Sequence, residues 1–185
     1  MDQKIFSLIN GLSHKNAILD VIGIFFAQYL AYLMVLAALF LILKERDWKR
    51  RVYHFSLASL SVILSRGIIT EIIRFFYHNP RPYMALNFKP LLSGEISFSF
   101  PSGHMAAYFA LALAVFYINK KAGQWFLGIV VLMGIARIFV GVHWPSDILG
   151  GIVVAVLSFY AVKYFLPRSE NFLALGKKKA PLPTE

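Results

Sequence analysis

The stretch that decides the fold is VIGIFFAQYLAYLMVLAALFLIL, residues 21–43, which runs for 23 residues without a charged side chain. An α-helix rises about 1.5 Å per residue, so this stretch is long enough to cross a hydrocarbon core of about 30 Å. Hydrophobic residues make up 58% of the whole chain. Further apolar runs that predict spans occupy residues 54–75, 102–118, 124–142 and 147–166. The sequence therefore predicts an all-α integral membrane bundle with about five transmembrane helices.

The N-terminal residues 1–16 are too short and too polar to form another span. Within them, apolar side chains recur at helical spacing, at Ile5, Leu8, Ile9 and Leu12, which predicts an amphipathic helix that lies in the membrane interface. A cleaved signal peptide is not expected, because the following apolar run is long and lacks a small-residue cleavage site. We expect one membrane domain over residues 1–166 and a basic, flexible cytoplasmic tail over residues 167–185.

The basic residues indicate how the chain is oriented. The formal net charge is +10, and Lys and Arg concentrate in KERDWKRR at 44–51, in NKK at 119–121 and in the tail. With five spans these three segments fall on one side, and the positive-inside rule places them in the cytoplasm. The N-terminus and the 76–101 loop then lie outside. Nucleic-acid binding is not expected, because the basic residues flank apolar spans and no nucleic-acid motif is present.

Polar residues that are unusual beside membrane spans collect at the predicted outer end. One group opens the 102–118 span as FPSGH, where Ser102 is placed to cap a helix. A helix N-terminus also offers free N–H groups to an anion, and Gly103 allows an oxyanion to approach the backbone. An ordinary helix start explains the same pattern equally well. By itself, therefore, this motif leaves the function open.

Two further groups fall at the same end. Pro80 and Pro82 predict an extended backbone at Arg81, whereas the alternative is a plain surface turn. Arg137 lies in an apolar helix, where a charge is costly and usually functional. His143 is followed four residues later by Asp147, a spacing that suits a carboxylate orienting an imidazole. The alternative for His143 is an interfacial residue beside a tryptophan.

Taken together these groups predict a phosphate site, because arginine forks match phosphate oxygens and two histidines can supply a nucleophile and an acid. A zinc site made of histidines and Asp147 is the alternative. Three nearby arginines would repel a cation, and no HExxH spacing is present. The chain has no cysteine, which excludes thiol chemistry. We therefore expect neither a metal nor another cofactor.

The ordered motifs resemble the type 2 phosphatidic acid phosphatase family of membrane lipid phosphatases. Its signature is Lys, six residues, Arg-Pro; then Pro-Ser-Gly-His; then Ser-Arg, five residues, His, three residues, Asp. The chain has Arg74, then six residues, then Arg81-Pro82; these are followed by Pro101-Ser102-Gly103-His104 and by Arg137, His143 and Asp147 at the family spacing. It departs from the pattern twice, with Arg74 in place of Lys and Ala136 in place of Ser.

The resemblance implies a role for each matched residue. His143 is the implied nucleophile that forms a phosphohistidine, Asp147 its orienting partner and His104 the general acid. The implied phosphate-binding residues are Arg74, Arg81, Ser102, Gly103 and Arg137. Arg66 and Glu71 lie outside the motifs in the second span. We expect Arg66 to find a polar partner within the bundle and to serve the structure rather than the substrate.

The expected protein is a multi-pass phosphatase of a bacterial inner membrane, with its site facing the periplasm or cell exterior. It would remove the terminal phosphate from undecaprenyl diphosphate, phosphatidylglycerol phosphate or lipid A 1-phosphate. A lipid phosphotransferase and a non-catalytic scaffold or transporter are the alternatives. The expected partners are the lipid substrate and the bilayer, and no obligate protein partner is evident from the sequence.

Overall fold

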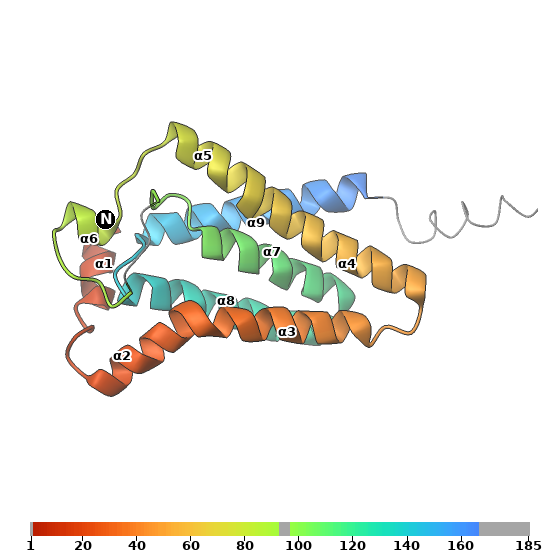
Figure 1. Cartoon of the computed structure of the whole chain (residues 1–185), viewed down its shortest axis with the longest axis horizontal. Coiled ribbons are helices and arrows are strands. Elements are labelled where there is room, and N and C mark those ends of the chain that lie inside the picture. Colours follow the sequence, from red (N-terminus) through yellow and green to blue (C-terminus); the bar gives the residue numbers. More distant parts are fainter. Residues whose placement is uncertain (1, 93–96, 167–185) are drawn as a thin grey trace, which may run out of the picture.

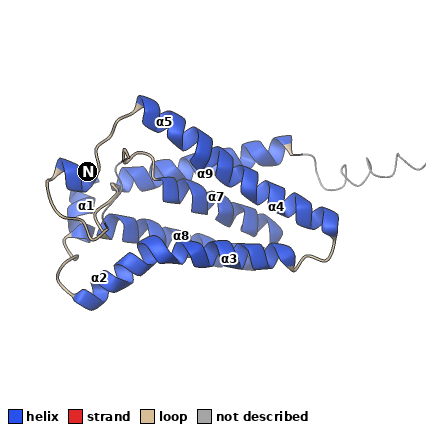
Figure 2. Ribbon diagram, in the orientation of Figure 1, coloured by secondary structure: helices blue, strands red, loops and turns tan. Residues whose placement is uncertain are grey.

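The computed structural model describes residues 2–92 and 97–166, and all regular elements within these ranges are helices (Figures 1 and 2). Five long helical segments run along a common axis and form a bundle (Figure 1). In chain order they are α2 (Ala17–Ile24) continued by η1 (Phe25–Tyr29) and α3 (Leu30–Leu43); α4 (Trp48–Val62) continued by η2 (Ile63–Ile69) and α5 (Thr70–Phe76); α7 (Gly103–Ile118); α8 (Lys120–Phe139); and α9 (Pro145–Phe165). The predicted all-α membrane bundle is confirmed.

Four of these segments are long and apolar enough to cross a membrane, whereas α7 has only 16 residues. α7 lies in the centre of the bundle, where it contacts α3, α4, η2, α8 and α9. Its sequence is apolar on all sides, and its alanines are fully buried at 106, 110, 112 and 114. Small side chains allow neighbouring helices to approach closely. Because protein rather than lipid surrounds α7, this helix needs less length than its neighbours.

The contact between α7 and α9 holds together the end of the bundle where both helices begin, which is called the site end below. A Cβ atom at Gly151 of α9 would lie 2.6 Å from the Cβ of Met105 and 2.7 Å from the carbonyl oxygen of Ser102. Glycine at 151 is therefore required by the close approach of the two helices. The backbone N–H of Ser102 also donates to the carbonyl of Asp147 at 3.0 Å. These contacts place the first turns of α7 and α9 side by side.

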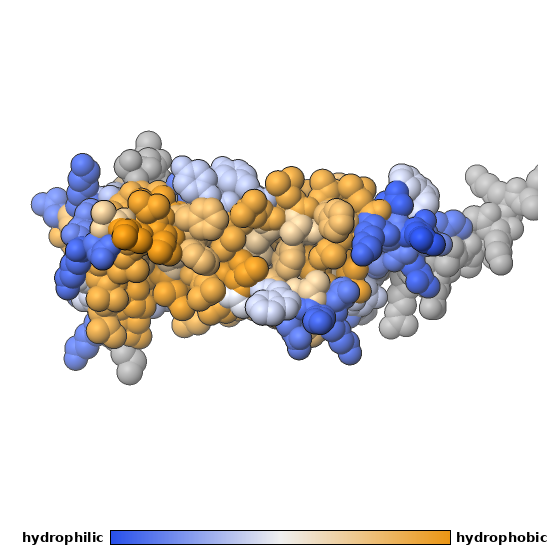
Figure 3. All heavy atoms as spheres, turned by 90° about the horizontal axis from the view of Figure 1, so that it is seen from below, coloured by the Kyte–Doolittle hydropathy of each residue, from blue (hydrophilic) through white to orange (hydrophobic). Residues whose placement is uncertain are grey.

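The two ends of the bundle differ in the segments that they carry. Figure 3 shows an apolar band over the middle of the molecule with polar residues at both ends. The 44–47 connection, Asn119 and the C-terminal end of α9 lie at one end, and the 77–102 segment and the α8–α9 connection lie at the other (Figure 1). The prediction that 44–51 and 119–121 share an end is confirmed. The predicted tail, 167–185, lies outside the described residues, so the division of the chain at 166 stays a prediction.

The predicted N-terminal helix is present as α1 (Asp2–Asn10) and packs across the site end. Phe6, which is 2% exposed, packs against Phe88 and Trp144, with ring centroids 6.0 and 5.1 Å away. The carboxylate of Asp2 accepts hydrogen bonds from the backbone N–H and the hydroxyl of Ser146, at 2.9 and 2.6 Å. The apolar side chains of Ile5, Leu8 and Leu12 stay exposed, which fits the predicted amphipathic character.

Candidate active site

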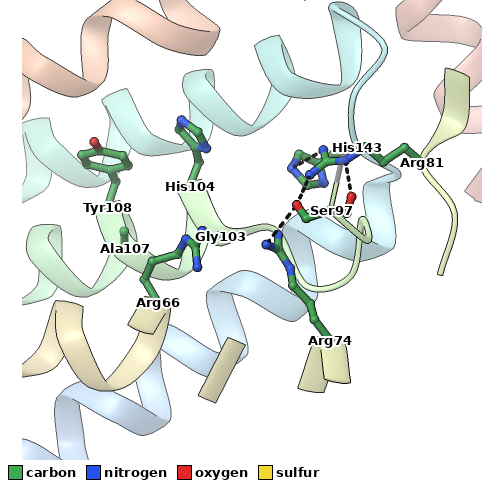
Figure 4. A pocket seen from close by; sticks show the side chains of 9 residues that line it. All are labelled: Arg66, Arg74, Arg81, Ser97, Gly103, His104, Ala107, Tyr108 and His143. Atoms are coloured by element: carbon green, nitrogen blue, oxygen red, sulfur yellow. Dashed lines mark hydrogen bonds between the residues drawn. The ribbon is translucent and has the colours of Figure 1, made fainter. Parts of the chain in front are cut away.

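A cavity of about 300 Å³ opens at the site end of the bundle. Its lining is strongly basic and brings together η2, α5, α7, the 77–102 segment and the α8–α9 connection (Figure 4). The lining residues are Arg66, Arg74, Arg81, Ser97, Gly103, His104, Ala107, Tyr108 and His143. Five of the eight residues predicted from the sequence are among them, and the other three are Ser102, Arg137 and Asp147.

His143 is buried beside the cavity, and Asp147 orients its ring. Nδ1 of His143 lies 3.2 Å from Oδ2 of Asp147, so a proton on Nδ1 is donated to the carboxylate. Nε2 is then the unprotonated nitrogen, and it lies 3.5 Å from Nη1 of Arg81. This is the arrangement that a nucleophilic imidazole requires, because its lone pair is on the nitrogen opposite the orienting carboxylate.

The surroundings of His143 keep its ring neutral. The residue lies in the connection between α8 and α9 and is 1% exposed. Burial lowers the pKa of His143 well below its usual value of 6.5, and the positive charges of Arg137 and Arg81 lower it further. At neutral pH the imidazole is therefore available as a base or nucleophile.

Asp147 is held in place by groups on the α8–α9 connection and on the 77–102 segment. Its Oδ2 accepts the backbone N–H of Trp144 at 2.8 Å, which caps the first turn of α9. Its Oδ1 accepts the side-chain N–H of Asn79 and the hydroxyl of Ser99, both at 3.5 Å. Asn79 and Ser99 were missed by the sequence analysis, because neither belongs to a motif. They fix the carboxylate that in turn fixes His143.

Arg81 is held beside His143 by backbone and side-chain acceptors. Its backbone is extended, with φ −68° and ψ 153°, as its flanking prolines predict. The guanidinium donates from Nε to the carbonyl of Ser97 at 2.7 Å, from Nη2 to the Ser97 hydroxyl at 3.1 Å and from Nη1 to the carbonyl of Val142 at 3.0 Å. These acceptors hold the guanidinium in one orientation, next to Nε2 of His143.

Arg74, the residue that replaces the lysine of the family motif, reaches the same place from α5. Its Nη2 donates to the carbonyl of Pro101 at 3.0 Å and its Nη1 to the Ser97 hydroxyl at 3.5 Å. Nη1 also lies 3.6 Å from Oε1 of Glu71. The hydroxyl of Ser97 thus lies between Arg74 and Arg81 (Figure 4). The arginine that stands in place of the family's lysine therefore keeps a positive charge in the cavity lining.

The start of α7 forms another wall of the cavity. The hydroxyl of Ser102 accepts the backbone N–H of Met105 at 3.5 Å, so the predicted helix cap is confirmed. Ser102 is itself fully buried and does not line the cavity. Gly103 and His104 do line it, and the positive end of the helix dipole is favourable for an anion there. The predicted contact between Ser102 and phosphate stays a prediction.

Arg137 lies deeper than the sequence analysis expected. It is 1% exposed and does not line the cavity. Its charge is close enough to lower the pKa of His143, where it has the largest effect after burial. Arg137 therefore acts on the histidine in this structure, and its predicted direct contact with phosphate stays a prediction.

Arg66, Ser97 and Tyr108 line the cavity although no sequence motif pointed to a role in the site. The polar partner that was expected for Arg66 is present, because Nη1 pairs with Oε1 of Glu71. Its location in the cavity was not expected. A charge inside a predicted span was the available signal, since such charges are rare and usually functional.

An apolar groove of about 420 Å³ continues from the basic cavity along the bundle. The groove lies between α3, α4 and α7, and its lining includes Leu39, Phe55 and Val62. Ala107 and Tyr108 line both the groove and the cavity. The site therefore combines a basic cavity with an apolar groove. An amphiphile with a phosphate headgroup requires both.

The fold defines an α-helical integral membrane protein that carries a cavity of arginines and histidines at one end. The sequence profile of the PAP2 superfamily matches residues 55–170, and the chain belongs to this superfamily. The resemblance identified from the three motifs is thereby confirmed.

Relatives with assigned activities match most of the chain. It is 35% identical to the undecaprenyl-diphosphatase BcrC of Bacillus subtilis over 159 residues, which cover 85% of this chain and 80% of that protein. It is 27% identical to phosphatidylglycerophosphatase B of the same organism, covering 89% and 77% of the two chains. The crystal structure of LpxE from Aquifex aeolicus superimposes with a TM-score of 0.71 at 25% identity, covering 89% of this chain and 95% of that one.

Proposed function

We propose that this protein is a membrane phosphatase that removes the terminal phosphate from a lipid phosphate or diphosphate through a phosphohistidine intermediate. The observation that carries the proposal is the His143–Asp147 pair, with Nδ1 held 3.2 Å from the carboxylate and Nε2 beside Arg81 in a basic cavity. Two relatives whose names state a lipid phosphatase activity support it.

In the first step Nε2 of His143 attacks phosphorus. A P–N bond forms and the P–O bond to the lipid breaks, while His104 gives its proton to the departing oxygen. The guanidinium groups of Arg74 and Arg81 and the N–H of Gly103 stabilise the charge on the phosphoryl oxygens. Asp147 stabilises the imidazole through Nδ1–H, which keeps its proton throughout.

In the second step water attacks the phosphohistidine. His104, now neutral, takes a proton from the water while the P–N bond breaks. Inorganic phosphate leaves, and both histidines return to their starting protonation states. The arginines hold the phosphoryl oxygens as they do in the first step. Apart from the attacking water, the side chains and the backbone N–H of Gly103 supply every group that the proposed reaction needs, and no step of the proposal is assigned to a metal.

The lipid nature of the substrate is supported by the apolar groove that Ala107 and Tyr108 connect to the cavity. Three lipid substrates fit the proposal: undecaprenyl diphosphate, phosphatidylglycerol phosphate and lipid A 1-phosphate. We place the protein in a bacterial inner membrane with the cavity facing outward, since the basic 44–51 segment lies at the opposite end.

The test is to offer the purified full-length protein each of these lipids in excess chelator, and to measure free phosphate and phosphorylated lipid separately. We expect free phosphate from at least one lipid, and none above background with His143→Ala. Phosphorylated lipid without free phosphate would show a phosphotransferase instead. Activity that appears only when zinc or magnesium is restored would contradict the arginine-based mechanism.

A further inference from the structure

Arg66 occupies a part of the cavity that the proposed mechanism does not use. We propose that Arg66 binds the phosphate next to the one that is transferred, and that it thereby makes the site selective for lipid diphosphates over lipid monophosphates. The inference rests on the proposed phosphatase function and specifies its substrate class.

The location of Arg66 is the first reason. Arg74, Arg81 and His143 gather around Ser97 in one part of the cavity, whereas Arg66 lies across from His104 and toward Tyr108 (Figure 4). Its side chain lies directly over the start of α7, since a Cβ at Gly103 would be 2.5 Å from Nε of Arg66. Arg66 is therefore placed between the site of phosphoryl transfer and the side of the cavity where Tyr108 begins the apolar groove.

The spacing along α7 is the second reason. His104 and Tyr108 are one helical turn apart, about 6 Å along the axis at about 1.5 Å per residue. A substrate that runs from His104 to the groove therefore has one headgroup unit between the transferred phosphate and its apolar chain. In a diphosphate lipid the intermediate unit is the second phosphate, which would face Arg66.

The backbone that carries Arg66 is fixed by two buried hydrogen bonds. The hydroxyl of Ser65 donates to the carbonyl of Ala106 on α7 at 3.0 Å, and the hydroxyl of Thr70 donates to the carbonyl of Ser65 at 2.8 Å. Ser65 lies within the π-helical turn η2, and Thr70 directly follows it. Such turns are frequent at functional sites. The turn thus holds the Cα of Arg66 against the first turns of α7.

The guanidinium itself is free to exchange its partner. It pairs with Glu71, but the two side chains are 42% and 50% exposed, and water screens an ion pair that is this exposed. A doubly charged phosphate with several acceptor oxygens is a stronger partner, because an arginine fork can bind it with two hydrogen bonds. Glu71 would then keep its contact with Arg74, whose Nη1 lies 3.6 Å from Oε1 of Glu71. A purely structural role does not require the arginine to line the cavity.

The experiment compares farnesyl diphosphate with farnesyl monophosphate, which share a chain and differ by one phosphate. We expect Arg66→Gln to lower kcat/KM for the diphosphate at least tenfold more than for the monophosphate, mainly through KM. Arg66→Lys should recover part of this selectivity, because it keeps the charge and loses the fork. The matched control is Arg51→Gln, which removes a charge from the other end of the same helical segment, where Arg51 binds the carbonyl of Glu45, and should leave the selectivity ratio unchanged.

Equal losses on the two lipids, or no loss on either, would overturn the inference. A wild-type protein that releases phosphate neither from these two lipids nor from the three lipids of the test above would instead refute the proposed function. A measurement on the wild type alone covers the case in which the variants do not fold. Methylenediphosphonate should then inhibit monophosphate hydrolysis at least tenfold more strongly than methylphosphonate, and equal inhibition would again overturn the inference.

Discussion

His143 and His104 face one cavity from two different elements, and their surroundings suit different tasks. His143 is buried and bonded to a carboxylate, whereas His104 is partly exposed at the start of α7 beside Tyr108. A nucleophile benefits from a fixed ring and a free lone pair, and a general acid benefits from access to the leaving group. The proposed division of labour between the two histidines follows from these surroundings.

Replacing either histidine should therefore impair a different step. We expect His143→Ala to abolish the phosphoenzyme and to lower turnover by several orders of magnitude, each tenfold being about 1.4 kcal/mol of barrier. His104→Ala should lose about 10²–10⁴-fold, the usual contribution of a general acid. With an aryl phosphate whose phenol is acidic, this second loss should shrink, because that leaving group needs no proton.

Rapid quenching with ³²P-labelled substrate separates the two roles. Acid-labile label should be trapped on wild type and on His104→Ala, and should be absent from His143→Ala. The reverse result, with label trapped on His143→Ala only, would exchange the two assignments.

The lowered pKa of His143 predicts the acid limb of the pH profile. Attack needs the neutral imidazole, and burial with the nearby arginines lowers the pKa of His143 well below 6.5. Because the folded pKa is depressed, the neutral form persists as pH falls through 6.5 and is lost only at lower pH. The acid limb of kcat/KM should therefore lie below pH 6.5. The substrate's phosphate group itself titrates near pH 6, so the pKa of the substrate is measured by ³¹P NMR and the pH profile is corrected for it. If the acid limb of the corrected profile lies above pH 6.5, His143 is not the group that must be neutral.

At the scale of elements, the site depends on how closely α7 and α9 approach. Ser102 begins α7, Asp147 lies in the first turn of α9, and a backbone hydrogen bond of 3.0 Å connects them. Gly151 allows this approach, whereas a Cβ atom at Gly128 on α8 would meet no heavy atom within 4 Å. Gly128 therefore provides a control for Gly151, because both lie within helices but only Gly151 lies at a helix contact.

We expect Gly151→Ala to destabilise the protein by about 1–3 kcal/mol, the usual cost of overpacking a core, and to lower activity by separating the two helix starts. Gly128→Ala should leave activity intact and raise stability slightly, since alanine is favoured over glycine within helices. Thermal unfolding in detergent and phosphate release measure the two effects. If Gly151→Ala were as stable and as active as Gly128→Ala, the close approach would not be what supports the site.

At the scale of the whole molecule, the basic 44–51 segment and the cavity lie at opposite ends of the bundle. The 44–47 turn and Asn119 lie at one end, and the cavity opens at the other, with the apolar band between them (Figures 1 and 3). Lys89, in the 77–102 segment, and Lys121, in the first turn of α8, are exposed at opposite ends. They provide reporters for the orientation of the whole bundle.

The chain has no native cysteine, so single cysteines can report topology directly. In spheroplasts, Lys89→Cys should react with a membrane-impermeant thiol reagent, and Lys121→Cys should react only after the membrane is permeabilised. This result follows if the positive-inside rule orients the bundle. Labelling of Lys121→Cys alone in intact spheroplasts would place the cavity in the cytoplasm.

The sequence by itself determined the helical spans, the cap at Ser102 and the extended backbone at Arg81. Each of these depends on local chemistry: a run of apolar side chains long enough to cross a bilayer, a hydroxyl before a helix, and a residue between two prolines. The ordered spacing of the three motifs was also enough to identify the superfamily and to point to His104 and His143.

Only the tertiary structure decided which of these residues share the cavity. It brought Arg66, Ser97 and Tyr108 into the cavity lining and left Ser102 and Arg137 buried away from it. The π-helical turn that carries Arg66 meets α7 through a hydrogen bond between Ser65 and Ala106, which are 41 positions apart in the sequence. A local pattern cannot predict such a contact, because the direction of a side chain depends on the helix against which its backbone packs.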